Sequence, residues 1–422
     1  MVVVICATVQ RKRKAKGERQ ELSGAKTGAL VRPLLAWFRQ NARDLPWRRT
    51  RDPYAIWISE IMLQQTQVKT VIPYWRRWMR GLPTVQSLAR ARRERVLKLW
   101  EGLGYYTRAN NLQKAARIIV DRHGGRFPQK YDDLVALPGI GRYTAGAVLS
   151  IAFNEPAPVL DGNVIRVLTR LFGIAENPRE KKTGARLWGL AQTLVRQAAT
   201  LSLFHEPTCS HLNQALMELG ATICTSRQPK CSLCPVRKHC IAFRENRVVK
   251  LPNLDQQAAL TERRFVAFVA ESRGRFHVRQ RPAGVVNARL WEFPNVEVDG
   301  CRSNSRQLAR DLFGSPPLVI EPLRQIRHTI TRFRITLEVV RVEFAGRKLR
   351  TIPNGRWCSL AELRKLAFPS AHRQIADRLC AVGIADRCNA RVGRASTMRS
   401  STTEDRSSRA GPSVASPQQP YN

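Results

Sequence analysis

The segment CTSRQPKCSLCPVRKHC, residues 224–240, constrains the folding of this chain more than any other feature. It holds four of the ten cysteines, Cys224, Cys231, Cys234 and Cys240, spaced C-x6-C-x2-C-x5-C. Four thiolates so close in sequence are typical ligands of a metal or a metal cluster, which then fixes the loop from several points. The residues between them include Arg and Lys but no acid, so the loop is also basic.

The spacing alone leaves the metal open. Common zinc sites contain two C-x2-4-C pairs, and only Cys231–Cys234 matches that pattern here, but a four-cysteine zinc site remains an alternative. The opening MVVVICATV lacks a preceding basic region and does not resemble a secretion signal, and no apolar run is long enough for a membrane helix. We therefore expect a cytoplasmic protein (nuclear in a eukaryote) without a membrane partner, in a compartment where thiols stay reduced.

The charge indicates a polyanionic partner. The formal net charge is +40 over 422 residues. Residues 1–27 contribute +5 and residues 385–422 contribute +3, so +32 remains on the part between them. Nucleic acid is the default partner of such a basic body. A generally basic proteome or a ribosome-associated surface is the alternative.

The apolar pattern divides the chain. Residues 1–27 are predicted to be a disordered basic arm, and residues 28–243 follow a helical pattern. Within this helical part, residues 84–104 predict one helix after a Thr84 cap. Its apolar face consists of Val85, Leu88, Val96, Leu99 and Trp100.

A second pattern follows a predicted linker over residues 244–262. Residues 263–282 and 332–344 alternate as strands, with ESRGR as a hairpin turn. A helical pattern returns over residues 359–383. Beyond Arg394, 13 of the last 28 residues are Ser, Thr or Pro, which predicts a disordered tail over 385–422.

LPGIGRYTAGAV, residues 137–148, predicts a hairpin between two helices. Gly139 and Gly141 are expected where the turn is too tight for side chains. Exposed backbone N–H groups at a helix N-terminus bind phosphate without reading sequence. A plain packing corner between helices is the alternative.

Two carboxylates suggest acid chemistry. Glu60 shares a helical face with Ile56 and Leu63, so burial should raise its pKa. Asp161 directly precedes a helix, where the dipole and nearby N–H groups favour the ionised form. One acid that holds a proton beside one persistent anion suits cleavage of a glycosidic bond. Locally, Glu60 can equally be a surface glutamate and Asp161 a simple N-cap.

Five motifs in order resemble one family. LPGIGRYTAGAV, VLDGNVIRVL (159–168) and the cysteine run resemble the helix-hairpin-helix DNA glycosylase superfamily. Within it, SEIMLQQTQV (59–68) and GLGYYTRANNL (102–112) closely resemble the MutY-type adenine DNA glycosylases. This resemblance implies a multidomain protein with an all-α glycosylase domain over 28–243 and an α+β Nudix-like domain after it.

The resemblance also implies how the helical domain is arranged. A six-helix barrel over about 53–152 would meet a module built from the flanking segments, with DNA between them. The loop 224–240 would hold a 4Fe–4S cluster near the DNA backbone. The implied partner is double-stranded DNA with adenine opposite 8-oxoguanine or guanine, bound by a monomer.

Roles follow residue by residue from the same resemblance. Glu60 would protonate the adenine, Asp161 would stabilise the oxocarbenium-like sugar, Tyr143 would support that intermediate and Asn163 would orient the site. Relatives of endonuclease III type carry a lysine nucleophile at the position of Tyr143, so the tyrosine implies a monofunctional enzyme.

Other residues match the family's DNA contacts. Gln65 and Tyr105 would enter the base stack where the adenine leaves. Gly139 and Gly141 would contact the backbone. Trp47, which can also be a core aromatic, would line the adenine pocket with Arg48 and Leu63.

The strand-rich half, residues 263–384, resembles the family's Nudix-like domain, which examines the 8-oxoguanine strand. The glutamate-dense helix of a Nudix hydrolase is lacking, so we expect a reader and not a hydrolase. Its usual F-S-H loop is replaced by Ile330, Thr331 and Arg332. Thr331 keeps a hydroxyl for contact with the lesion. We therefore expect a weaker preference for 8-oxoguanine over guanine.

Two other functions are carried as alternatives. One is an endonuclease III-like glycosylase with another base target. The other is a non-catalytic iron–sulfur protein that binds DNA. Tyr143 and the reader domain favour adenine excision over the first, and intact Glu60 and Asp161 disfavour the second.

Overall fold

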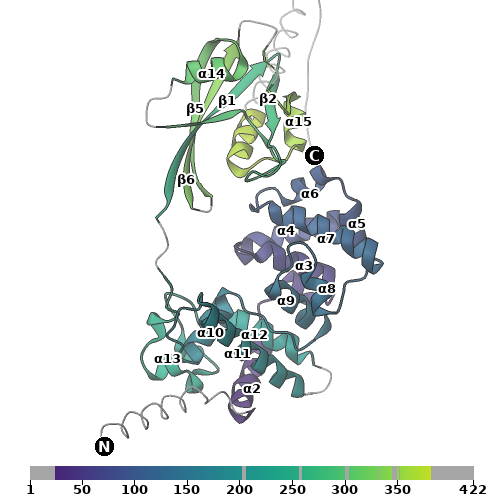
Figure 1. Ribbon diagram of the computed structural model, residues 1–422, viewed down its shortest axis with the longest axis vertical. Helices are drawn as coiled ribbons and strands as arrows, with labels where there is room; N and C mark the ends of the chain where they lie inside the picture. The colour runs from purple at the N-terminus through teal and green to yellow at the C-terminus, as the bar shows by residue number, and fades with distance from the viewer. Residues whose placement is uncertain are drawn as a thin grey trace, which may run out of the picture.

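The protein comprises two helical lobes followed by an α+β domain, as the computed structural model shows (Figure 1). Residues 24–201, 206–255, 259–299, 304–330, 332–344, 349–350 and 352–381 are described. Thr331, the expected tail 385–422 and most of the expected arm 1–27 lie outside these residues. The arm's expected end overlaps α2, which begins at Gly24.

The first lobe surrounds an aromatic core in which Trp57, Trp78 and Trp100 are almost fully buried. Trp78 and Trp100 pack edge to face with ring centroids 5.6 Å apart, an arrangement that aromatic quadrupoles favour. The lobe consists of η1 (Pro46–Arg49), α3 (Pro53–Leu63), α4 (Val68–Gly81), α5 (Val85–Arg90), α6 (Arg93–Trp100), α7 (Thr107–His123), α8 (Tyr131–Val135) and α9 (Arg142–Phe153).

The second lobe combines the N-terminal helix with later segments around an aliphatic core. It consists of α2 (Gly24–Asn41), α10 (Gly162–Leu171), α11 (Lys181–Thr200), α12 (Thr208–Thr222), η2 (Cys231–Leu233), η3 (Arg237–His239), α13 (Ile241–Arg244) and η4 (Val248–Lys250). Helix α9 joins the lobes, because Val148 lies in the first core and its neighbour Ala147 in the second.

The single helix predicted over residues 84–104 is wrong, because the chain breaks into α5 and α6. Ala91 and Arg92 adopt extended backbone, and Thr84 caps α5 in a capping box as expected. The carbonyl group of Ala91 accepts a hydrogen bond from Gln113 Nε2 at 2.7 Å, and Arg117 Nε donates to the carbonyl of Ala89. These side chains of α7 satisfy groups that a continuous helix would pair internally.

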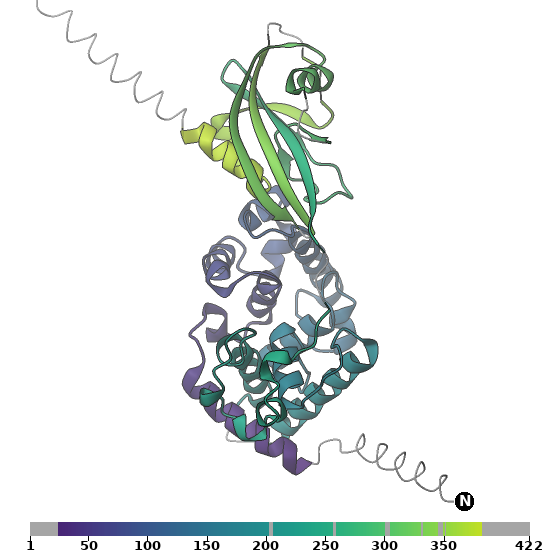
Figure 2. The ribbon, with the colours of Figure 1, turned by 90° about the vertical axis from the view of Figure 1, so that its left-hand side faces the viewer.

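The C-terminal domain is a mixed sheet with helices on both faces (Figure 2). Strand β1 is parallel to β6 and antiparallel to β2 and β4. The path β3-β2-β1-β6-β5 orders the main strands, with β4 beside β1 and β7 beside β2. The strands are β1 (Thr261–Ser272), β2 (Arg275–Gln280), β3 (Trp291–Glu292), β4 (Asn295–Val298), β5 (Pro317–Ile330), β6 (Phe333–Phe344) and β7 (Gly355–Ser359).

Alternation along β1 explains the two layers. Val266 and Phe268 face α14 (Ser305–Phe313), whereas Ala267 and Val269 face a helix over 370–381. Successive side chains of a strand point to opposite faces of the sheet. Because β1 is apolar at successive positions, it is buried on both faces. The expected strands, the ESRGR turn and the helices over 359–383, which begin with α15 (Leu360–Lys365), are confirmed.

The sequence pattern did not predict β5, although it spans 14 residues. The strand is at the sheet edge, contains Pro317 and Pro322, and shows no regular burial alternation. Edge strands tolerate proline because one row of N–H groups is unpaired. The expected linker 244–262 likewise contains η4 and the first residues of β1. In the described part of the chain, none of the helices combines the length and apolarity needed to span a bilayer.

Candidate active site

A cavity of about 720 Å³ brings together residues that are far apart in the sequence. Its walls come from η1 and α3 of the first lobe, α10 and α12 of the second, and α9, which joins them. Eight of the residues singled out in the sequence line it: Trp47, Arg48, Glu60, Leu63, Gln65, Tyr143, Asp161 and Asn163.

Glu60 is buried on α3 and paired with Tyr143 of α9. The Tyr143 hydroxyl lies 2.6 Å from Glu60 Oε2 and donates to it. Burial raises the pKa of Glu60 to about 7, against the opposing effect of the Tyr143 hydrogen bond, and the nearby charge of Asp161 raises it further. The expected rise is therefore confirmed, and Glu60 can hold or release a proton near neutral pH. Burial also raises the pKa of Tyr143 well above its ordinary value.

Asp161 caps α10 and faces the same cavity. Its Oδ1 accepts from the backbone N–H of Val164 at 2.7 Å, and its Oδ2 accepts from Asn163 Nδ2 at 2.9 Å. Both bonds favour the carboxylate, as expected for an N-cap. Burial nevertheless outweighs them and raises the pKa of Asp161 overall. The expectation of a net shift toward the ionised form is therefore wrong, because the local pattern contained no measure of burial.

A third carboxylate of the cavity, Glu218 on α12, holds Arg43 and Arg48, and the sequence reasoning missed it. Glu218 is buried and accepts from Arg43 Nη2 at 3.0 Å and from Arg48 Nη2 at 2.8 Å. Gln214, one turn earlier, accepts from Arg48 Nε at 3.0 Å. The two arginines lower the pKa of Glu218 despite its burial. The i, i+4 spacing of Gln214 and Glu218 on a helix was the available signal.

Arg166 connects Asn163 to the cysteine loop. Its Nη2 donates to Asn163 Oδ1 at 2.8 Å and its Nε donates to the carbonyl of Cys224 at 2.8 Å. The fully buried Arg170, one turn further along α10, donates to the carbonyl groups of Thr225 and Leu251. Several hydrogen bonds from one planar guanidinium fix the positions of its partners. Arg166 therefore holds both the cysteine loop and Asn163 in place.

The four cysteines of the loop gather in space. Burial raises the pKa of the Cys234 thiol to about 11, and neighbouring Cys224, Cys240 and Cys231 raise it further. Arg170 Nη1 lies 3.4 Å from Cys224 Sγ. Within the described ranges, no three Cys, His, Asp or Glu side chains converge on a single-ion site. Four gathered thiols are a donor set that either an iron–sulfur cluster or a zinc ion can use.

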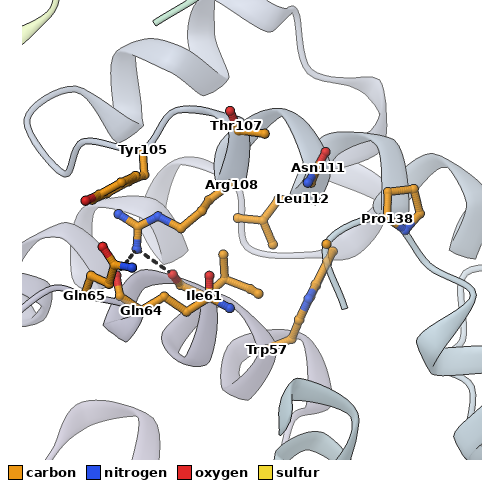
Figure 3. Close-up of a pocket in the computed structure, with 11 residues that line it drawn as sticks. Trp57, Ile61, Gln64, Gln65, Tyr105, Thr107, Arg108, Asn111, Leu112 and Pro138 are labelled. Carbon is orange, nitrogen blue, oxygen red and sulfur yellow. Dashed lines mark hydrogen bonds between the residues drawn. The ribbon is translucent and has the colours of Figure 1, made fainter. Parts of the chain in front are cut away.

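A smaller cavity of about 230 Å³ adjoins the first, and Gln64 and Gln65 line both (Figure 3). Tyr105 lies at its rim, 46% exposed. Gln65 and Tyr105 both have a positive φ, 56° and 48°, a conformation that costs non-glycine residues energy and is concentrated at functional sites. Arg108 lies between them and donates to the carbonyl groups of Gln64 and Gly104.

The helix-hairpin-helix turn lies beside this cavity, with α8 before it and α9 after it. Gly139 has φ +80°, and a Cβ there would lie 2.8 Å from Asn111 Cβ. Gly141, in contrast, has φ −97° and open space around a Cβ. The expectation of a tight turn at both glycines is wrong for Gly141. No side chain caps α9 there, which leaves its first N–H groups to solvent or a ligand.

The expected reader loop connects β5 and β6, where Ile330 pairs with Phe333. The guanidinium of Arg332 lies 5.1 Å from the Phe333 ring centroid. Thr331 lies outside the described residues. These residues are not part of the two cavities described above.

Comparisons with known proteins match both halves. The family described as "HhH-GPD superfamily base excision DNA repair protein" matches residues 58–193, and a NUDIX domain matches residues 265–378. The adenine DNA glycosylase of Rattus norvegicus is 37% identical, covering 82% of this chain and 77% of the relative. That of Homo sapiens is 36% identical, covering 81% and 72%.

Among solved structures, a thermostable thymine-DNA glycosylase is similar at 32% identity and a TM-score of 0.47, covering 52% of this chain and 98% of that one. The expected fold class, a helical glycosylase half with an α+β Nudix-like domain, is confirmed by the two family matches. With the long matches to two curated relatives, they show that this chain is an enzyme of the adenine DNA glycosylase family.

Proposed function

We propose that the protein hydrolyses the N-glycosidic bond of adenine mispaired with 8-oxoguanine or guanine in duplex DNA, without a strand-cleaving step. The observation that carries this proposal is the pair of Glu60 and Asp161 in one cavity, with a pKa of about 7 at Glu60. An acid that holds its proton near neutrality beside a hydrogen-bonded carboxylate suits departure of a nitrogen base from a sugar.

The chemistry follows from the two carboxyl groups. Protonated Glu60 gives its proton to the extruded adenine, and the C1′–N9 bond breaks with its electron pair leaving on the base. Asp161, held by Val164 N–H and Asn163, stabilises the positive charge that develops on the sugar. Water then adds to C1′ and its proton returns to Glu60. The product is free adenine and an abasic site.

Tyr143 supports the absence of a lyase step. Its hydroxyl donates to Glu60 and carries no amine that can form a Schiff base with the sugar. The charged nitrogens among the described residues that line the cavity belong to Arg43, Arg48 and Arg166. Arginine stays protonated and is a poor nucleophile. We therefore expect strand breaks only after alkali.

We further propose that Cys224, Cys231, Cys234 and Cys240 hold a 4Fe–4S cluster. Four neighbouring thiols are the donor set that such a cluster uses, and the cluster when bound would cross-link the loop. Arg166 and Arg170 of α10 then hold the loop against the helix that Asp161 caps. The exposed cations of the loop, such as Arg237, would face DNA phosphates.

Duplex DNA is proposed to lie along the hairpin and the two cavities, bound by a monomer in the nucleoid or nucleus. The open approach at Gly141 and the uncapped start of α9 support a backbone phosphate there. Gln65 and Tyr105 would enter the base stack left by the adenine. The β5–β6 loop with Ile330 and Arg332 would examine the opposite base, with reduced preference for 8-oxoguanine.

A single-turnover assay tests this function. Labelled duplexes would carry adenine opposite 8-oxoguanine, guanine or thymine, and each product would be split with and without hot alkali. We expect product from the first two duplexes only, and only after alkali. Strand breaks without alkali would refute the monofunctional chemistry. Product from none of them would refute adenine excision.

A further inference from the structure

Among the contacts between the C-terminal domain and the first helical lobe, two come from the backbone of one residue, Phe368. Its N–H donates to Glu101 Oε1 at 2.8 Å, and its carbonyl accepts from the Tyr106 hydroxyl at 3.1 Å. These partners are more than 260 positions away in the sequence. Both backbone groups of Phe368 are therefore bonded to the other domain. We call this set of bonds the Phe368 contact.

The surroundings make the Phe368 contact well defined. Arg373 Nε donates to Glu101 Oε1 at 2.7 Å, and Lys98 Nζ lies 2.6 Å from Glu101 Oε2. The side chains of Glu101 and Arg373 are only 12% and 16% exposed. Ala367 and Leu290 of the C-terminal domain are buried in the aromatic core of the first lobe. Polar bonds in such a site resist exchange with water, unlike exposed ion pairs.

The two helical-lobe partners flank one short loop. Glu101 directly precedes Gly102, and Tyr106 directly follows Tyr105, so the loop 102–105 lies between the two bonds. The Tyr106 oxygen also accepts from the Gly102 N–H at 3.2 Å. Gly102, Gly104 and Tyr105 all have positive φ, at 101°, 71° and 48°. A loop with so many left-handed residues needs outside support to keep one conformation.

The support continues to the other side of the small cavity. Arg108 Nη2 donates to the carbonyl groups of Leu103 and Gly104, while its Nη1 donates to that of Gln64 at 2.6 Å. Figure 3 shows Arg108 between Tyr105 and the Gln64–Gln65 segment. Tyr105 and Gln65 therefore belong to one hydrogen-bonded unit, and the Phe368 contact attaches that unit to the C-terminal domain.

We propose that Glu101 and Tyr106 are positioning residues through which the docked C-terminal domain holds Tyr105 in the conformation needed to extrude adenine. The proposal rests on the proposed function, because it assigns Tyr105 to the base stack. The C-terminal domain would examine the base opposite the adenine. Its docking thereby lowers the free-energy cost of extruding the adenine from its pair. The chemical step at Glu60 does not depend on it.

The test compares paired and unpaired adenine. Full-length wild type, Glu101→Gln and Tyr106→Phe would be assayed in single turnover on adenine opposite 8-oxoguanine and on adenine opposite an abasic analogue. Tyr106→Phe keeps the ring and removes only the oxygen. We expect each variant to lose about tenfold on the mispair, as for one hydrogen bond, and less than about twofold on the unpaired adenine. Fluorescence of 2-aminopurine at the target position would show the same reduction in base extrusion.

Arg275→Gln is the matched control, since it breaks an ion pair with Glu362 inside the C-terminal domain, 3.0 Å long. It should behave as wild type, and thermal unfolding midpoints would verify that all variants are folded. Equal losses on both substrates, or no loss on either, would overturn the inference. Absence of excision by the wild type would instead refute the proposed function.

Discussion

At the scale of single residues, catalysis depends on how burial is balanced by hydrogen bonds. Glu60 is buried and Asp161 is partly buried, and both have raised pKa values, but their partners differ. Glu60 accepts one hydrogen bond, from the Tyr143 hydroxyl. Asp161 accepts two, from the Val164 backbone N–H and from the Asn163 side-chain amide. In the proposed mechanism, this difference in donors is why the proton is placed on Glu60 and the charge on Asp161.

Glu60→Gln and Asp161→Asn should each abolish excision while duplex binding is retained. Loss of a general acid or of a charge-stabilising group costs about 10²–10⁴-fold or more in rate. Glu60→Gln keeps an oxygen for the Tyr143 hydrogen bond, whereas Asp161→Asn can keep the bond from the Val164 N–H but loses the acceptor for Asn163 Nδ2. Single-turnover rates and gel-shift titrations would measure the two properties. Excision that survived both changes would contradict the assignment.

The pH dependence should follow Glu60. With a pKa of about 7, the protonated form predominates below pH 7, so the excision rate at low substrate should decrease about tenfold per pH unit above it. The stability effect has the same sign. The folded state holds the proton more tightly than the unfolded chain, whose glutamate has its ordinary pKa of 4.5, so stability decreases as pH rises from about 4.5 to 7.

Glu60→Gln removes the free-energy cost of ionising Glu60 in the folded protein. At pH 8 the variant should therefore be more stable than wild type by up to about 3 kcal/mol. Urea unfolding at pH 5 and pH 8 would measure the difference. A variant equally stable relative to wild type at both values would contradict the raised pKa.

At the scale of elements, the hairpin between α8 and α9 contains two glycines with different expected roles. Gly139 is needed for steric reasons, and Gly141 for DNA binding. Gly139→Ala places a Cβ 2.8 Å from Asn111 at φ +80°, so it should destabilise by about 1–3 kcal/mol. Gly141→Ala has space and an ordinary φ, and should cost less, about 0.5–1 kcal/mol, because alanine is a poorer N-cap than glycine. Thermal unfolding distinguishes them.

Gly141→Ala should still weaken DNA binding several-fold, because the new methyl group lies where a phosphate would approach the uncapped helix. A variant that binds DNA as wild type would show that the open face of Gly141 is not a contact.

The cysteine loop is the second element whose role can be tested. Cys231→Ser should reduce iron content and visible absorption and should weaken DNA binding, because the loop loses one attachment point. Cys380→Ser, in the C-terminal domain and outside the loop, is the control and should retain both properties. Stoichiometric zinc without iron in wild type would contradict the cluster assignment.

At the scale of the whole molecule, the charge of +40 and the two-domain arrangement point to one extended DNA surface. Binding should weaken steeply with salt, with log K decreasing by about 0.9 for each phosphate neutralised. Titrations between about 50 and 200 mM salt would give the slope. Arg237→Gln should reduce it by about one if this side chain contacts a phosphate, and an unchanged slope would exclude that contact.

The sequence by itself determined the residue types and the division of the chain. Glu60, Asp161 and Tyr143 were identified from short motifs, and the change of period near residue 262 separated helices from strands. These signals are local, because helical and strand periodicities depend on neighbours a few positions away. The hairpin at Arg273 and Gly274 and the Thr84 cap were predictable for the same reason.

Only the tertiary structure decided the features that join distant segments. The break between α5 and α6 depends on Gln113 of another helix, β5 is held by its partner β6, and burial reversed the expected shift at Asp161. Glu218 and the Phe368 contact involve partners about 170 to 270 positions apart. Burial and long-range pairing are properties of the packed chain, and no local pattern specifies them.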